Sequence, residues 1–204
     1  MSTPAVEFQA LRRSIAEFEG RFLSEHLASP PSLSPPGRKE LLDVAAFVVL
    51  THGSVENFVE GLALWVLDRS VSNWTTRRRV SRCTVSLLLF QSAAAVPEAP
   101  TTIFDNLRVS LDEAKESVSK AIRENNGITP RHLRELFYPL GVDVPTAAVQ
   151  TASLELLVRI RHQWAHQFRF GAQVLRSAKD IKVTADDCIA FADDLRRKAA
   201  DARP

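Results

Sequence analysis

The chain has 204 residues, of which 45% are hydrophobic and 25% charged, a balance that suits one globular domain with a substantial core. Its seven glycines and single tyrosine disfavour a β-sandwich or barrel, because such folds need more turn residues and more aromatics. A net charge of +2 is too small to give the whole protein a positive electrostatic field that attracts nucleic acid strongly. Binding to nucleic acid would therefore need a local basic patch.

Helical periodicity dominates the first part of the chain. Apolar residues spaced by three and four predict an amphipathic helix over 5–27, and two Pro-Pro pairs predict a stiff connector over 28–37. Residues 38–69 are apolar on two neighbouring faces, which is typical of a central helix packed on several sides. Gly53 is a candidate position for a kink or a division of this helix. The longest uninterrupted apolar run, 44–50, is far shorter than a membrane span.

The second part of the chain alternates between helical segments and breaks. Residues 85–96 and 103–125 are predicted helices, separated by prolines. Thr129 followed by Pro130 is an N-cap with a proline at the first helical position, and predicts a short helix over 130–138. The remaining predicted elements are a strong helix over 147–169, a loop over 171–182, and a last helix that a capping box at Thr184–Asp187 opens.

These segments predict an all-α protein: an antiparallel helical bundle with additional short helices. We expect a single domain over 1–204, with an N-terminal helix (1–27), a proline-rich linker (28–37) and a bundle core (38–204).

The two cysteines, Cys83 and Cys188, lie far apart and have no cysteine–histidine spacing typical of zinc sites. We expect two reduced, partly buried thiols in a cytoplasmic protein. The N-terminus has neither a basic start nor an apolar run, so no signal peptide is expected. Nor do we expect a cofactor, a bound metal or a membrane partner.

One predicted helix, 147–169, carries most of the candidate chemistry. Arg161 falls on a stripe that is otherwise apolar, where a charge is costly unless it is paired or faces a wet cleft. Arginine binds phosphate oxygens in a bidentate manner and histidine transfers protons near neutral pH, so together they suit phosphodiester cleavage. The adjacent stripe holds the basic residues Arg159, His162, His166 and Arg169.

The same residues have simpler interpretations. An arginine on a helix is usually solvated or ion-paired, which is the ordinary expectation for Arg159 and Arg169. His162 and His166 are four residues apart and could bind a metal, but no third ligand accompanies them. The run Arg77–Arg79 could grip RNA, although a charge run is more often a solvated face.

The segment Arg161-His162-Gln163-Trp164-Ala165-His166 resembles the signature of the HEPN superfamily, in which a polar residue follows an arginine and a histidine closes the motif. The flanking segments are similar to those of stand-alone bacterial members associated with ribosomal L-PSP-type proteins. The resemblance spans roughly residues 40–197. Outside the motif, three segments carry the resemblance. They are Leu156-Leu157-Val158 directly before it, and, further upstream, the segment 52–59 and Leu136-Phe137 followed by Gly141-Val142.

The resemblance implies a HEPN-type bundle and a metal-independent endoribonuclease. Arg161 would bind and stabilise the scissile phosphate, and His166 would be the general acid or base. His162 would orient the site or share the proton transfer. Members dimerise with their motif helices meeting across a two-fold axis, so a homodimer with its active site at that interface is expected. The RNA 2′-hydroxyl would attack its own phosphate.

Glu56 is a supporting candidate on the most apolar helix, one turn from His52. A carboxylate there would hold Arg161, while a structural ion pair or a pair with His52 is an equally good alternative. Arg159 and Arg169 are candidates for binding substrate. Phe168 stands where antitoxin-modified members carry a tyrosine, so the sequence argues against that antitoxin chemistry.

The expected function is that of an RNase acting on RNA as a toxin or defence effector, with room for an antitoxin or another regulatory partner. Two alternatives remain open: a non-catalytic HEPN module that binds nucleotide or RNA, and a dimerisation scaffold with an idle motif.

Overall fold

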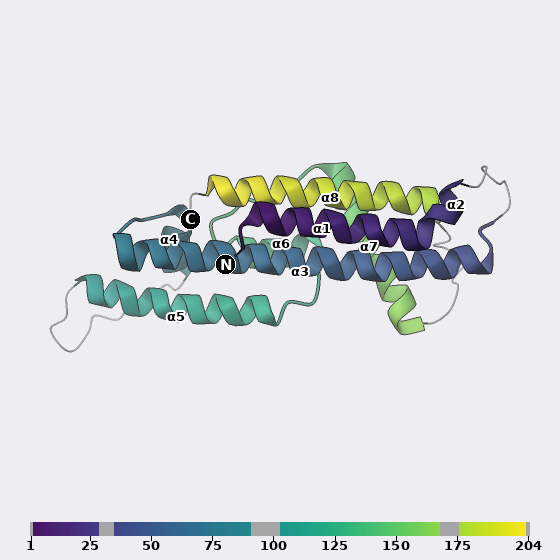
Figure 1. Cartoon of the computed structure of the whole chain (residues 1–204). Helices are drawn as coiled ribbons and strands as arrows, with labels where there is room; N and C mark the ends of the chain where they lie inside the picture. Colours follow the sequence, from purple (N-terminus) through teal and green to yellow (C-terminus); the bar gives the residue numbers. More distant parts are fainter. Residues whose placement is uncertain (1, 29–34, 91–102, 168–175, 203–204) are drawn as a thin grey trace.

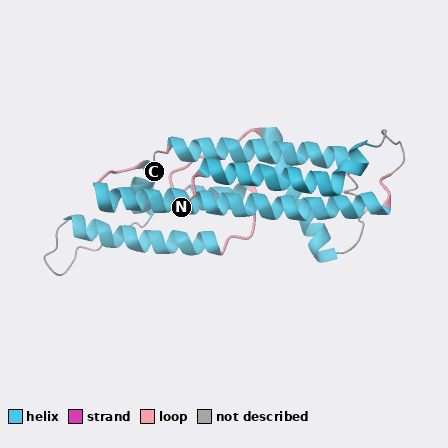
Figure 2. Ribbon diagram, viewed as in Figure 1, coloured by secondary structure: helices cyan, strands magenta, loops and turns pink. Residues whose placement is uncertain are grey.

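The computed structural model describes residues 2–28, 35–90, 103–167 and 176–202, and only the backbone at 103–105 and 165–167. Every regular element in these ranges is helical (Figure 2), which confirms the all-α prediction. The elements are α1 (Pro4–Phe18), the π-helical turn η1 (Glu19–Leu23), α2 (Ser24–Ala28), α3 (Arg38–Arg77), α4 (Arg82–Phe90), α5 (Ile103–Arg123), α6 (Pro130–Phe137), α7 (Ala148–Gln167) and α8 (Ala178–Asp201).

The long helix α3 is the centre of the molecule. It has 40 residues and therefore spans about 60 Å, and elements from both halves of the chain contact it. It runs without a break through Gly53, so the suggested division is wrong, and it ends at Arg77 rather than near residue 69. The extension forms because Ser70, Val71 and Trp74 continue its buried face. One stretch of α3 is long and apolar enough to cross a membrane; half of that stretch is buried against neighbouring helices.

Three long helices lie side by side in Figure 1. α1 runs antiparallel to both α3 and α8, and contacts both of them. α5 runs antiparallel to α3 along its C-terminal half, where α4 also packs. α7 contacts both α3 and α8, so the helix that carries the motif is attached to the centre of the bundle.

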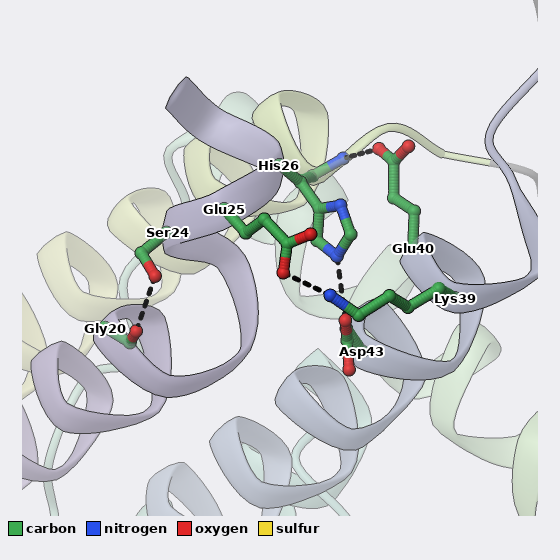
Figure 3. Close-up of polar contacts among 8 residues, drawn as sticks. Gly20, Ser24, Glu25, His26, Lys39, Glu40 and Asp43 are labelled. Carbon is green, nitrogen blue, oxygen red and sulfur yellow. Dashed lines mark hydrogen bonds and ion pairs between the residues drawn. The ribbon is translucent and has the colours of Figure 1, made fainter. Parts of the chain in front are cut away.

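Polar contacts join α2, α3 and α8 at one end of the bundle (Figure 3). His26 Nε2 lies 2.8 Å from Asp43 Oδ2, and Lys39 forms an ion pair with Glu25. The carboxylate of Glu40 accepts a hydrogen bond from the first backbone N–H of α8, that of Ala178, at 3.1 Å. A carboxylate at a helix N-terminus is favourable because it meets unpaired N–H groups and the positive end of the helix dipole. These contacts fix the start of α8 against α3.

The start of α8 corrects the predicted capping box. The helix begins at Ala178 with a reciprocal box between Ser177 and Asp180, and Thr184 lies inside the helix, where its hydroxyl donates to the carbonyl of Asp180. The predicted loop over 171–182 is therefore wrong from residue 178 onwards. Its last residues are helical because Ala178 and Ile181 continue the buried face of α8.

Other predicted boundaries agree closely with the structure. The predicted helix over 5–27 corresponds to α1, η1 and α2 in continuous sequence, and Thr129 caps α6 as expected. Both cysteines are free and fully buried. Several predicted segments lie outside the described residues, namely 29–34 of the connector, 91–96 of the predicted helix after 85, and 168–169 at the end of the motif helix.

Candidate functional site

The motif helix α7 presents its apolar side to the bundle. Leu154, Leu157 and Ile160 are fully buried and form its packing seam, whereas Val158 and Arg161 are half-buried. The structure therefore places Arg161 at the border of the seam, where its stem can pack while the guanidinium stays accessible. A half-buried arginine of this kind avoids most of the desolvation cost that full burial would impose.

The other basic residues of the motif helix are arranged differently. Arg159 and His162 are exposed on α7. Exposure agrees with the simple interpretation of Arg159 as a solvated residue. His166 lies on the α7 backbone, and its side chain is outside the described part of the chain, as is all of Arg169.

Two polar residues of α3 lie in the region of Arg161. The side chains of His52 and Glu56 are 3% and 22% exposed, and His52 Nδ1 is 3.8 Å from Glu56 Oε2. Burial, and then the positive charge of Arg161, lower the pKa of His52 to about 4. His52 is therefore neutral near pH 7, and 3.8 Å is too long for a hydrogen bond. The interpretation of this pair as an ion pair does not hold at neutral pH.

Glu56 is held in a mixed environment. Burial and the negative charge of Glu60 raise the pKa of Glu56, while Arg161 and His132 act in the opposite direction. One carboxylate oxygen, Oε1, is buried and has no hydrogen-bond partner. Such an oxygen is costly, so its retention is more typical of a functional region than of a packing site. Arg161, on a different helix, acts on Glu56 through its charge, which favours the ionised carboxylate.

Sequence reasoning missed three members of this group. Glu60 follows Glu56 by one turn, and its Oε1 accepts a hydrogen bond from Asn125 Nδ2 at 2.8 Å. His132, in the first turn of α6, acts electrostatically on Glu56. The spacing of four between His52, Glu56 and Glu60 on an apolar helix was a signal for Glu60. No comparable pattern marks Asn125 or His132, because the fold brings them to α3 from a loop and a short helix.

Among the residues with described side chains, no three histidine, cysteine, aspartate or glutamate groups gather in the manner of metal ligands. The described site offers the guanidinium of Arg161, the half-buried carboxylates of Glu56 and Glu60, and neighbouring imidazoles. Such groups can bind a phosphate and stabilise charge that develops on its oxygens.

A family model described as RiboL-PSP-HEPN matches residues 21–201, which is most of the chain. Comparisons with curated proteins and with solved structures gave no match. HEPN domains are often RNases, and the match supports a nucleotide- or RNA-related function in general. The matched range includes every helix from α2 to α8 and both Glu56 and Arg161. The chain belongs to the RiboL-PSP-HEPN family.

Proposed function

We propose that the protein is a metal-independent endoribonuclease in which Arg161 and His166 carry the reaction. The observation that carries the proposal is the placement of Arg161, half-buried at the border of the core and near the partly desolvated carboxylate of Glu56. Water screens charges less at such a border than on an open surface, so a guanidinium there interacts strongly with a phosphate. Glu56 would keep that guanidinium in a fixed direction.

The proposed reaction needs only groups that the chain and the RNA supply. The ribose 2′-oxygen forms a bond to phosphorus and its proton passes to a general base. The bond from phosphorus to the 5′-oxygen breaks, and a general acid protonates that oxygen. The products are a cyclic phosphate and a 5′-hydroxyl. His166 serves as one of the two proton-transfer groups, His162 assists, and Arg161 stabilises the charge on the non-bridging oxygens.

A homodimer is part of the same proposal. Leu42 and Val49 on α3 are 49% and 42% exposed, and they precede Glu56 at intervals of seven residues. Residues seven apart share a face of a helix, so an exposed apolar stripe leads directly to the polar group. A second copy related by a two-fold axis would cover this stripe and bring the two motif helices together. Light scattering at micromolar concentration is expected to give twice the monomer mass; a monomer would count against the arrangement.

The test is RNA cleavage in the presence of EDTA, with the ends of the products analysed for cyclic phosphate. Arg161→Ala and His166→Ala are each expected to lose on the order of a hundredfold in rate, and His162→Ala less. The matched controls are Arg197→Ala, which removes an exposed arginine paired with Asp193 on α8, and His26→Gln, which removes a histidine that contacts Asp43 near the start of α3. Both controls are expected to cleave at the wild-type rate.

The outcomes separate the alternatives. RNA binding that depends on Arg161, without cleavage by any preparation, would identify a non-catalytic binding module. Neither binding nor cleavage, with a dimer intact, would identify a scaffold. Activity that disappears with EDTA and returns with magnesium or manganese would refute the metal-independent mechanism. A role as a toxin or defence effector predicts that wild-type protein, but not His166→Ala, arrests the growth of cells that express it.

A further inference from the structure

The turn that follows α3 carries a cluster of arginines. Arg77 ends α3, Arg78 and Arg79 follow it, and Arg82 begins α4; all four residues are exposed. Figure 1 shows this turn at one end of the long helix α3. Positive charges that lie this close in the chain repel one another, and an anion among them relieves the repulsion. The cluster therefore suits a polyanion better than it suits an apolar partner.

Arg78 has a backbone conformation that is unusual for an arginine. It follows the end of α3 in the left-handed region, with φ 55° and ψ 28°, and its N–H donates to the carbonyl of Trp74 at 3.1 Å. In the described part of the chain it is the only residue besides glycine with a positive φ. Helices that end in this way usually place glycine or asparagine there, because a Cβ is unfavourable. An arginine that its backbone disfavours is more typical of a functional side chain than of a helix cap.

A surface cavity of about 430 Å³ adjoins this cluster, between α4 and the segment that follows α6. Apolar side chains line it, namely Val85 and Leu89 of α4 and Tyr138 at the end of α6. Leu89 is 72% exposed and Tyr138 is 53% exposed. Arg82 belongs both to the cluster and to the cavity lining. Exposed apolar side chains around a cavity are typical of a binding site.

Polar groups line the same cavity. Arg82 Nη2 donates to Asp143 Oδ2 at 3.1 Å, and the hydroxyl of Ser86 donates to the carbonyl of Tyr138 at 2.9 Å. The side chains of Arg82 and Asp143 are 60% and 58% exposed, so their ion pair adds little to stability and a ligand can reach both groups. A nucleobase has a flat apolar face and an edge of hydrogen-bond donors and acceptors. An apolar cavity with a guanidinium and a carboxylate at its border fits that chemistry.

We propose that the cavity and the arginines form a second RNA-binding site, here called the distal site, which holds a single strand away from the motif. One unpaired base enters the cavity against Tyr138, and Arg77–Arg79 bind the neighbouring phosphates. Proteins bind single strands in this manner because bases stack on aromatic rings while arginines bind the backbone.

The distal site sets a minimum length for a substrate that occupies both places. Arg77 follows Glu56 by 21 residues on the unbroken helix α3, which corresponds to about 30 Å. A strand that is cleaved near Arg161 and held at the distal site must therefore be several nucleotides long. This role in cleavage rests on the proposed function, whereas the binding of RNA by the distal site does not.

The first measurement is fluorescence anisotropy with a labelled strand of about 20 2′-O-methyl adenosines, which lacks the attacking hydroxyl and is not cleaved. Replacing both Arg77 and Arg79 by glutamine is expected to raise Kd about tenfold at about 0.1 M salt and to reduce the salt slope by about 1.4. Tyr138→Ala should raise Kd about tenfold at an unchanged slope, because stacking involves no charge, and Tyr138→Phe should bind like wild type. The matched control replaces both Arg12 and Arg13, exposed residues of α1, by glutamine and should leave Kd and slope unchanged.

Arg78→Gly separates binding from stability. Glycine relieves the left-handed backbone, so this variant should be at least as stable as wild type in urea denaturation and yet bind the strand more weakly. A simpler role for the arginines is to stabilise the C-terminal end of α3 through the helix dipole. That role predicts a loss of stability with wild-type affinity, and this result would overturn the proposal.

The second measurement compares cleavage of a 20-nucleotide RNA with cleavage of a dinucleotide, which cannot reach both places. Tyr138→Ala should lower the ratio of kcat/KM for the long RNA to that for the dinucleotide about tenfold, and a wild-type ratio would refute the role in cleavage. Unchanged Kd in variants that circular dichroism shows to be folded would overturn the distal site and favour an acidic, apolar peptide as its occupant. If wild-type protein cleaves neither RNA, the proposed function fails, and the anisotropy measurement alone decides the distal site.

Discussion

Substitution of His52 by glutamine is expected to make the protein more resistant to acid. The pKa of His52 is lowered from 6.5 to about 4, first by burial and then by Arg161. Above pH 6.5 the residue is neutral in both the folded and the unfolded chain and contributes nothing. As the pH falls towards 4, the unfolded chain binds a proton that the folded chain cannot, so stability is lost over this interval. His52→Gln does not lose stability in this way, because glutamine binds no proton in either state.

The size of the effect follows from the pKa. Each pH unit between the folded and unfolded values corresponds to about 1.4 kcal/mol, so the whole interval corresponds to about 3 kcal/mol. Between about pH 7.5 and about pH 4.5 the free energy of unfolding of wild type should therefore fall by about 2.5 kcal/mol more than that of His52→Gln. Little of this is lost to solvent screening, because the side chain is 3% exposed.

The contribution of Glu56 to stability changes with pH in the opposite direction, and it must be distinguished from the contribution of His52. Its pKa is raised, so its contribution to stability is present at low pH and is lost as the pH rises through the folded value. Because His52 and Glu56 lie 3.8 Å apart, the comparison is repeated in a Glu56→Gln background, where neither protein carries the contribution of Glu56.

The assay is urea denaturation followed by circular dichroism at several pH values between those limits. His26→Gln is the control and should not gain stability in acid, because the imidazole that it removes lies 2.8 Å from the Asp43 carboxylate. A difference between wild type and His52→Gln that stays constant with pH would refute the reasoning, since it would mean that His52 binds a proton as readily in the folded chain as in the unfolded one.

Three further predictions concern other positions. Arg161→Lys should keep the stability and helical content of wild type but cleave RNA about tenfold more slowly, because lysine cannot bind phosphate in a bidentate manner. Gly141→Ala should lower the stability by about 1–2 kcal/mol in urea denaturation, because Gly141 has a φ of +67° and a methyl group there would lie 3.0 Å from the carbonyl oxygen of Arg82. Burial raises the pKa of Cys83 to about 11 and that of Cys188 to about 12, so both thiols should react with Ellman's reagent only after unfolding, and rapid reaction in the native protein would contradict their burial.

Much of the fold could be predicted from periodicity because helices record their packing in local sequence. The spacing of apolar residues indicated α1, α3, α5, α7 and the body of α8, and Thr129-Pro130 marked the start of α6. The failures lie where a local signal competed with packing. Thr184 has the sequence of a cap, yet burial of Ala178 and Ile181 extends α8 to Ser177. Gly53 weakens α3 locally, but contacts on both sides of it keep the helix continuous.

Within the site, the sequence by itself determined which chemistry was available: a motif arginine and histidine on one helix, and a glutamate with a neighbouring histidine on another. It also determined that Arg161 would lie near an apolar seam, because the period of the helix fixes which residues share a face.

Only the tertiary structure decided which groups act on one another. Packing of α6 between α3 and α7 brings His132 into the environment of Glu56, although 76 residues separate the two in the chain. Burial of His52 makes it neutral, which removes the ion pair that its spacing from Glu56 suggested. Periodicity describes the direction of a side chain around its own helix axis. Charge state and partnership depend instead on desolvation and on distances between helices, which are set when the helices pack.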